Sequence, residues 1–200
     1  MQNWWINPKI KDPETAEAFK SLEKVFSLTG EMLSEGNINN TFKLQISDKT
    51  YFVKLYFRGG RRLRRWFGTS RLYKEWLNLK RFEEWQFNCP EIIAFGIQKF
   101  GPIFIRGALI TAEVPCTQDL LYLQKHKKEL FENKEWFDSV STQVADATRI
   151  MHENSFAHGD LKWRNILVTE GKNPQVYFFD CPMGSFWKTP FLNYRIIKDL

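Results

Sequence analysis

The segment FAHGDLKWRNILV, residues 156–168, places charged and amide side chains in a short turn between two apolar stretches. Asp160 and Asn165 stand five residues apart in this turn, and Asp180 ends the next apolar stretch, fifteen residues after Asn165. An Asn and an Asp at the ends of adjacent strands supply oxygen ligands that suit a hard cation. A further carboxylate beside them can accept a proton from a reacting group. The spacing therefore indicates a metal-assisted reaction with a general base.

A second charged pair is expected upstream. Lys54 lies in the middle of a strand pattern among apolar and aromatic neighbours, and Glu75 lies on the apolar face of a helical pattern. Leaving one ion of a buried pair without its partner costs roughly 3–5 kcal/mol. We therefore expect Lys54 and Glu75 to form an ion pair.

The elements that must position these residues follow from hydrophobic periodicity and from capping residues. We expect, in chain order, a short helix within the first thirty residues, an antiparallel hairpin at 41–56, a helix from Thr69 or Ser70 to about Trp85, strands at 91–97 and 103–114, a helix capped by Thr117, a long amphipathic helix at 135–155, and strands at 165–169 and 175–180. Because strands dominate before residue 115 and helices after it, the order predicts an α+β fold with two lobes, 1–115 and 116–200.

Composition bounds the class of protein. The 200 residues suffice for one domain or for two small lobes. The first ten residues lack the charged start and apolar run of a secretory signal, and no apolar stretch approaches the roughly 20 residues of a membrane-spanning helix. The three cysteines lie far apart, which argues against a disulfide framework and a zinc site. We expect a cytoplasmic protein.

The net charge of +6 is concentrated in one loop, residues 58–71, which holds six arginines and no acidic residue. The remaining 23 basic residues are balanced by 23 acidic ones. Such a loop attracts phosphates, acidic saccharides, nucleic acid or an anionic membrane surface, or is simply a solvated loop. Aromatic residues beside the arginines favour a membrane–water interface. The residues concerned are Arg58, Arg61, Arg62, Arg64, Arg65, Trp66, Phe67 and Arg71.

The order Lys54, Glu75, Asp160, Asn165 and Asp180, each on a suitable element, resembles the constellation of protein kinases. HGDLKWRN resembles the kinase catalytic loop in the form found in kinases of small molecules and sugars, and YFFDCPMG stands where the magnesium-binding Asp-Phe-Gly lies. Together with the upstream GGRRLRRWFGTSRLYKEWLNLKRF, these motifs are similar to the bacterial lipopolysaccharide core kinases, which phosphorylate heptose or Kdo. The resemblance covers about residues 30–187 and implies a bilobal protein-kinase-like fold and an ATP- and Mg²⁺-dependent phosphotransferase.

The resemblance also implies a role for each motif residue. On the catalytic side, Asp160 would accept the proton of the sugar hydroxyl, Lys162 would meet the γ-phosphate, Asn165 and Asp180 would hold Mg²⁺, and His158 would brace the loop. On the nucleotide side, Lys54 would contact the α- and β-phosphates and be held by Glu75, Gly36 would lie in the phosphate loop, and adenine would lie against the backbone of Glu113 and Val114.

The sequence departs from the kinase pattern in two places. The nucleotide loop LSEGNINNTF has one glycine, Gly36, where kinases often have three, and we expect Asn37, Asn39 and Asn40 to supply left-handed geometry and amide donors instead. Only twenty residues follow Asp180, so we expect the helical lobe to be truncated.

Two other classes of function compete with this interpretation. An atypical protein kinase of the RIO type also carries an HGDL loop, and a non-catalytic pseudokinase or a basic nucleic-acid-binding module could be built around residues 58–71. A pseudokinase usually loses one of the Lys, Asp, Asn or Asp positions, and a nucleic-acid binder needs basic residues across a whole face. We therefore expect no nucleic acid partner, a lipid-linked saccharide of the lipopolysaccharide core as acceptor, and peripheral contact with the inner membrane through Arg58, Arg61, Arg62, Arg64, Arg65 and Trp66.

Overall fold

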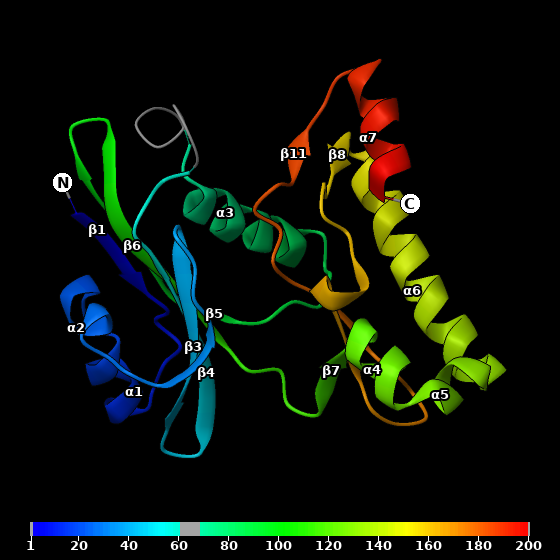
Figure 1. Ribbon diagram of the computed structural model, residues 1–200, viewed down its shortest axis with the longest axis horizontal. Helices are drawn as coiled ribbons and strands as arrows, with labels where there is room; N and C mark the ends of the chain where they lie inside the picture. Colours follow the sequence, from blue (N-terminus) through cyan, green and yellow to red (C-terminus); the bar gives the residue numbers. More distant parts are fainter. Residues whose placement is uncertain (1, 61–68, 200) are drawn as a thin grey trace. The chain divides into compact units, whose positions relative to one another are not determined.

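The computed structural model describes residues 2–60 and 69–199 (Figure 1). The chain divides into two compact units. The first comprises Met1–Trp76 and Glu91–Glu113, and the second comprises Leu77–Pro90 and Val114–Leu200. The division falls inside helix α3 (Arg71–Glu84), so one helix contributes residues to both units.

A six-stranded antiparallel sheet dominates the first unit, with strand order β1-β5-β6-β4-β3-β2. Its strands are β1 (Gln2–Ile6), β2 (Glu31–Ser34), β3 (Asn39–Ile46), β4 (Lys49–Tyr56), β5 (Ile92–Phe100) and β6 (Ile103–Ala112). The predicted hairpin is confirmed as β3 and β4, joined by a tight turn in which Ser47 has a φ of 53°. The short strand β1, which pairs with β5, was not predicted, because five residues carry too little alternation to mark a strand.

Alternation along the hairpin places successive side chains on opposite faces of the sheet. Phe42 and Val53 belong to the buried core cluster, together with residues of and around helices α1 (Pro13–Ala18) and α2 (Leu22–Phe26). Figure 1 shows these two helices beside the sheet. Thr41 and Lys54 are directly opposite each other and share the other face. The face with Phe42 and Val53 therefore forms the core cluster of this unit, and the opposite face, which also carries Phe52 and Tyr56, carries Lys54.

The single helix predicted near the N-terminus is two short helices. Asp12 accepts a hydrogen bond from the backbone N–H of Thr15 at 2.8 Å and begins α1, and Ser21 accepts one from Lys24 at 3.2 Å and begins α2. Each cap satisfies a backbone donor that would otherwise lack a partner, so the chain restarts its helix at Ser21. The periodicity of the apolar residues does not mark the interruption between the two helices, so the sequence predicts one helix.

Helix α3 begins where the sequence predicts, because the Ser70 hydroxyl accepts the backbone N–H of Tyr73 at 3.2 Å. Its inward face combines the predicted residues Leu72, Glu75, Leu79 and Phe82, which are all buried. Leu72 lies against the backbone of β6 at Gly107, where the absence of a side chain permits close approach of helix and sheet.

Four helices and short strands make up most of the second unit among the described residues. The helices are α4 (Leu120–His126), α5 (Lys128–Glu132), α6 (Lys134–Glu153) and α7 (Phe191–Asp199), and the strands are β7 (Thr117–Asp119), β8 (Phe156–Ala157), β9 (Ile166–Thr169), β10 (Val176–Phe178) and β11 (Ser185–Phe186). The amphipathic pattern predicted for α6 is confirmed, since Val140, Ala147 and Met151 are buried. The order of the two small sheets is β10-β9-β7 and β11-β8.

The predicted cap of α4 is wrong by two residues. Asp119, not Thr117, accepts the backbone N–H of Tyr122, at 2.8 Å. Thr117 lies in β7, and its hydroxyl donates to the carbonyl oxygen of Val114 at 2.7 Å. Pairing of β7 with β9 holds this segment extended, so the helix starts only after it.

Most of the arginine-rich loop lies outside the described residues, including Arg61, Arg62, Arg64, Arg65, Trp66 and Phe67. Of the arginines that flank it, Arg58 is exposed and Arg71 is half-buried at the start of α3. None of the helices in the described ranges is both long and apolar enough to cross a membrane.

Gly107→Ala should destabilise the first unit. A Cβ added at Gly107 would lie 2.4 Å from Leu72 Cδ2 and 2.6 Å from the carbonyl oxygen of Gly96, so α3 or β5 must shift. Overpacking of this kind commonly costs about 1–3 kcal/mol. Urea unfolding of the variant and the wild type measures the loss, and an unchanged midpoint would show that Leu72 does not press on this strand.

Candidate active site

The predicted Lys54–Glu75 ion pair is present in the first unit. Lys54 Nζ donates to Glu75 Oε1 at 2.8 Å, and the Glu75 side chain, from α3, is almost fully buried. The Tyr56 hydroxyl donates to the second carboxylate oxygen at 2.6 Å. Both oxygens of Glu75 therefore have a donor, as a buried carboxylate requires. Tyr56 shares a strand face with Lys54, two residues away, and this alternation was the sequence signal for its role.

A second ion pair lies farther along the face of the sheet that carries Lys54. Lys43, two residues beyond Thr41 on β3, forms an ion pair with Glu113 at 2.9 Å, and both side chains are partly exposed. The backbone N–H of Glu113 donates to the carbonyl oxygen of Thr50 at 2.9 Å. Because that N–H is already hydrogen-bonded, it is not available to a ligand. The carbonyl oxygen of Glu113 is the backbone atom of this residue that can accept a hydrogen bond from a nucleobase.

The loop before β3 does not use the predicted left-handed geometry. Asn37, Asn39 and Asn40 all have negative φ, and Gly36 does too. Instead, the Asn40 side chain accepts the backbone N–H of Gly36 at 3.2 Å, which ties the two ends of the loop together. An asparagine side chain hydrogen-bonding to nearby backbone is an ordinary way to close a turn, and it makes positive φ unnecessary.

Asp160 and Asn165 are held together in the catalytic-loop segment of the second unit. Asn165 Nδ2 donates to the carbonyl oxygen of Asp160 at 2.8 Å and to its Oδ2 at 3.3 Å, and Asn165 is buried. Lys162 forms an ion pair with Asp160 Oδ1, and Arg164 lies 3.8 Å from Oδ2. The carboxylate of Asp160 is partly exposed, so it is oriented from one side and accessible from the other.

Asn165 and Asp180 stand at the same end of the β9–β10 hairpin. Ile166 pairs with Phe178, and the backbone N–H of Phe179 donates to the carbonyl oxygen of Asn165 at 3.4 Å. Asp180 follows with a φ of 53°, an uncommon conformation for a non-glycine residue that is enriched at functional sites. Because Asn165 Nδ2 is engaged by Asp160, the Asn165 amide oxygen is left as an acceptor, and Asp180 supplies a carboxylate at the same end of the hairpin. Amide and carboxylate oxygens are the kinds of ligand that Mg²⁺ prefers.

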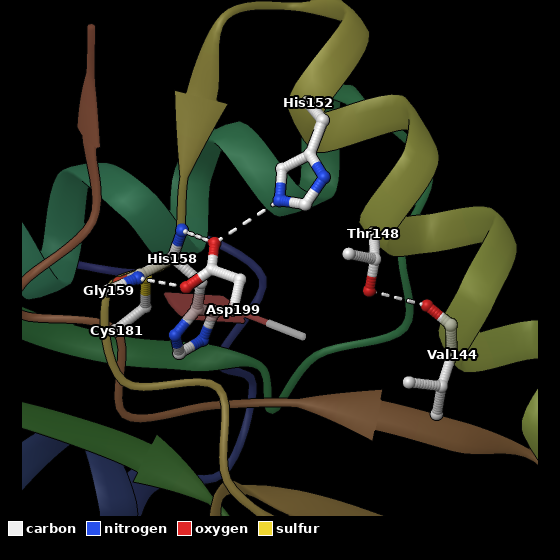
Figure 2. A network of polar contacts seen from close by, with 7 residues as sticks. All are labelled: Val144, Thr148, His152, His158, Gly159, Cys181 and Asp199. Carbon is white, nitrogen blue, oxygen red and sulfur yellow. Dashed lines mark hydrogen bonds and ion pairs between the residues drawn. The ribbon is translucent and has the colours of Figure 1, made fainter. Parts of the chain in front are cut away.

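Asp199, at the end of α7, anchors the segment that precedes Asp160 (Figure 2). Its carboxylate accepts the backbone N–H groups of His158 and Gly159, each at 2.7 Å, and His152 Nε2 lies 3.3 Å from Oδ2. Asp199 is only 6% exposed. Sequence reasoning missed this residue. The available signal was weak: in the sequence, Asp199 is the only acidic residue after Asp180, and it ends a helix whose other residues are apolar, aromatic or basic apart from Asn193.

His158 is a packed side chain rather than a reacting one. Its ring is fully buried and stacks on Phe82, with centroids 6.0 Å apart and an interplanar angle of 16°. Within the described part of the chain, neither ring nitrogen has a hydrogen-bond partner. Burial lowers the pKa of His158, so the imidazole is neutral and braces the loop, as the sequence predicts.

A family model described as the lipopolysaccharide kinase (Kdo/WaaP) family matches residues 23–183. The chain belongs to this family of kinases, and the match favours this class over the RIO-type and nucleic-acid-binding alternatives. Among solved structures, the one titled "WaaP in complex with acyl carrier protein" is similar, with a TM-score of 0.68 and 18% sequence identity. The similarity covers 99% of this chain and 79% of that chain, so the mixed α/β fold is that of WaaP. No curated protein matches the chain.

Asp199→Asn should loosen the catalytic-loop segment. The substitution removes the charge and turns an NH₂ group toward a backbone N–H, and hydrogen bonds to charged groups contribute about 1.5–3 kcal/mol each. We expect lower stability and faster hydrogen exchange at the amides of His158 and Gly159. Asp138→Asn, at an exposed position of α6, is the matched control and should leave both unchanged. Slow exchange at these amides in Asp199→Asn would contradict the anchoring role.

His158 should make stability depend on pH. Because burial lowers its pKa below the ordinary 6.5, the unfolded chain binds the proton more readily than the folded one. The contribution of neutral, buried His158 to the free energy of unfolding is therefore complete above about pH 6.5, and it decreases as the pH falls toward the folded-state pKa. His158→Phe keeps a ring against Phe82. In this variant the melting temperature should depend less on pH than in the wild type, between about pH 7.5 and 5.5. Exposed His126→Gln is the control, and an equal slope in all three proteins would exclude this role for His158.

Proposed function

We propose that the chain is a bilobal, protein-kinase-like phosphotransferase. It transfers the γ-phosphate of ATP to a hydroxyl of heptose or Kdo in the lipopolysaccharide inner core. Membership of a lipopolysaccharide kinase family supports the class of reaction. The single observation that carries the proposal is the Asp160–Asn165 turn, in which a partly exposed carboxylate is fixed by a buried amide.

The first unit would bind the nucleotide. Lys54, fixed by Glu75, would contact the α- and β-phosphates as a positioned cation. The loop containing Gly36 would cover the phosphates, and the adenine would contact the backbone carbonyl of Glu113 and the N–H of Val114. The ion pair supports this role because Glu75 fixes the position of the ammonium group and supplies a counter-charge to this partly buried cation.

The second unit would carry the chemistry. Asn165 and Asp180 would hold Mg²⁺, which when bound neutralises charge on the transferring phosphate. Asp160 would take the proton of the acceptor hydroxyl as its oxygen attacks the γ-phosphorus and ADP leaves. Lys162, which neutralises Asp160 in this structure, would turn to the γ-phosphate when a nucleotide is present.

The acceptor would be lipid-linked, and the arginine-rich loop would contact the anionic inner-membrane surface that presents it. Each arginine near such a surface contributes about 1 kcal/mol. Arg58 is exposed and fits this role. The proposal places the protein in the cytoplasm, reversibly at the inner membrane.

Transfer of phosphate from ATP to deacylated core oligosaccharides tests the proposal, with mass analysis of the product. Asp160→Asn and Asp180→Asn should each lower turnover, by about 10²–10⁴-fold for loss of the general base. Their melting temperatures should stay close to the wild type, and Asp138→Asn should remain fully active. Wild-type protein that binds ATP without transferring phosphate would instead be a pseudokinase, and variants with normal turnover would refute the assigned roles.

A further inference from the structure

Three consecutive side chains between Asp160 and Asn165 take no part in the hydrogen bonds of Asn165 that close the turn. Lys162, Trp163 and Arg164 occupy the stretch whose ends are fixed by the hydrogen bonds of Asn165. Trp163 is 47% exposed, and the side chains of Lys162 and Arg164 are 57% and 59% exposed. Tryptophan buries more apolar surface than almost any other residue, so its exposure beside a reactive carboxylate requires an explanation.

Trp163 is held in place despite its exposure. Its ring stacks on Phe131 of α5 at 5.6 Å between centroids and an interplanar angle of 21°, and Phe131 in turn packs on the buried Trp136. Trp163 also lines a hollow of about 730 Å³ in the second unit, which leaves room beside the indole. A rigid, partly exposed aromatic ring next to a hollow is a suitable platform for the apolar face of a sugar ring.

Lys162 and Arg164 carry two positive charges, whereas Asp160, which both contact, carries one negative charge. Arg164 approaches Asp160 with one guanidinium nitrogen at 3.8 Å, and Lys162 pairs with the other carboxylate oxygen. A guanidinium group has five N–H donors in a fixed fork, and this single long contact uses few of them. The remaining donors can bind a carboxylate or phosphate group in bidentate geometry. The surroundings of Asp160 are therefore suited to an anionic ligand rather than a neutral one.

We propose that Trp163 and Arg164 form the acceptor-binding subsite and select an anionic sugar. The sugar ring lies on the Trp163 indole, and a carboxylate or phosphate group of the acceptor pairs with Arg164. A hydroxyl of the same saccharide then reaches Asp160. The inference rests on the proposed function and deepens it, because it assigns the acceptor a negative charge close to the reacting hydroxyl.

A second role for Arg164 makes a different prediction. If the guanidinium only neutralises Asp160, its removal alters proton transfer and lowers the turnover of every acceptor alike. If it binds the anionic group of the acceptor, its removal raises KM only for acceptors that carry that group. Comparing one saccharide with and without its charge separates these roles.

The experiment uses the purified full chain and a Kdo-containing core oligosaccharide, as the free acid and with its carboxylate converted to the uncharged methyl ester. Arg164→Gln should raise KM for the acid about tenfold to a hundredfold, the loss expected for a hydrogen bond between charged groups, with kcat and the KM for ATP nearly unchanged. KM for the ester should change little. A heptose acceptor that carries a phosphate but no carboxylate is measured in parallel. The acceptor whose KM rises in Arg164→Gln shows whether the arginine binds a carboxylate or a phosphate.

Trp163 is tested with the same acceptors. Trp163→Ala should raise KM for acid and ester alike, by about tenfold, because the platform contacts the ring and not the charge. Trp163→Phe keeps a ring against Phe131 and should retain most of the affinity. Lys172→Gln, which removes one exposed charge from the β9–β10 turn, is the control and should behave as the wild type.

Calorimetric titration with the oligosaccharide alone, without ATP, provides a readout that does not depend on turnover. Loss of binding to the acid in Arg164→Gln, with unchanged binding to the ester, supports the subsite. Equal binding of both forms by the wild type and Arg164→Gln, or an equal fall of kcat with both acceptors, overturns it. Absence of phosphate transfer by the wild type refutes the proposed function instead, and normal transfer without dependence on acceptor charge refutes only this inference.

Discussion

The buried carboxylate of Asp199 is the constraint on which the geometry of the catalytic-loop segment depends. A carboxylate removed from water needs donors for its lone pairs, or its burial is strongly unfavourable. Here the donors are two consecutive backbone N–H groups, those of His158 and Gly159, with His152 beside them. Satisfying Asp199 therefore fixes the path of the backbone just before Asp160. Gly159 accepts this path with a φ of 75°, a value at which most other residues would be strained.

The two units meet the same physical requirement with different partners. Glu75 is also a buried carboxylate, but it is satisfied by side chains, the ammonium of Lys54 and the hydroxyl of Tyr56. A side-chain cation can change its partner when a phosphate approaches, whereas a backbone amide cannot leave its place. Glu75 would thus suit the proposed role of directing the Lys54 ammonium toward a nucleotide, whereas Asp199 keeps the backbone before Asp160 in one position. The two carboxylates differ in whether their donors are mobile side chains or fixed backbone amides.

Periodicity and local capping made much of this arrangement predictable. The 41–56 hairpin, helix α3 with its Ser70 cap, and the Lys54–Glu75 pair all follow from patterns within about twenty residues. Asp199 contacts His158 across 41 residues, and no local pattern in the sequence encodes that contact. Strands β8 and β11 have two residues each and exist only because their partners are brought together. The cap of α4 moved from Thr117 to Asp119 because the pairing of β7 with β9 overrides a local preference.

The turn that carries Asp160 is anchored at both ends, which supports the catalytic and acceptor-binding roles proposed for it. Before Asp160 the backbone is tied to Asp199, and after it the buried Asn165 amide is tied back to Asp160. The side chains between these ties, Lys162 to Arg164, are largely exposed, although Lys162 and Arg164 contact Asp160 and Trp163 stacks on Phe131. Under the proposed function, substitution there would alter which ligand is bound without removing the hydrogen bonds from Asn165 and to Asp199 that hold the turn. A turn of this construction would combine the fixed geometry that catalysis requires with exposed side chains that contact the acceptor.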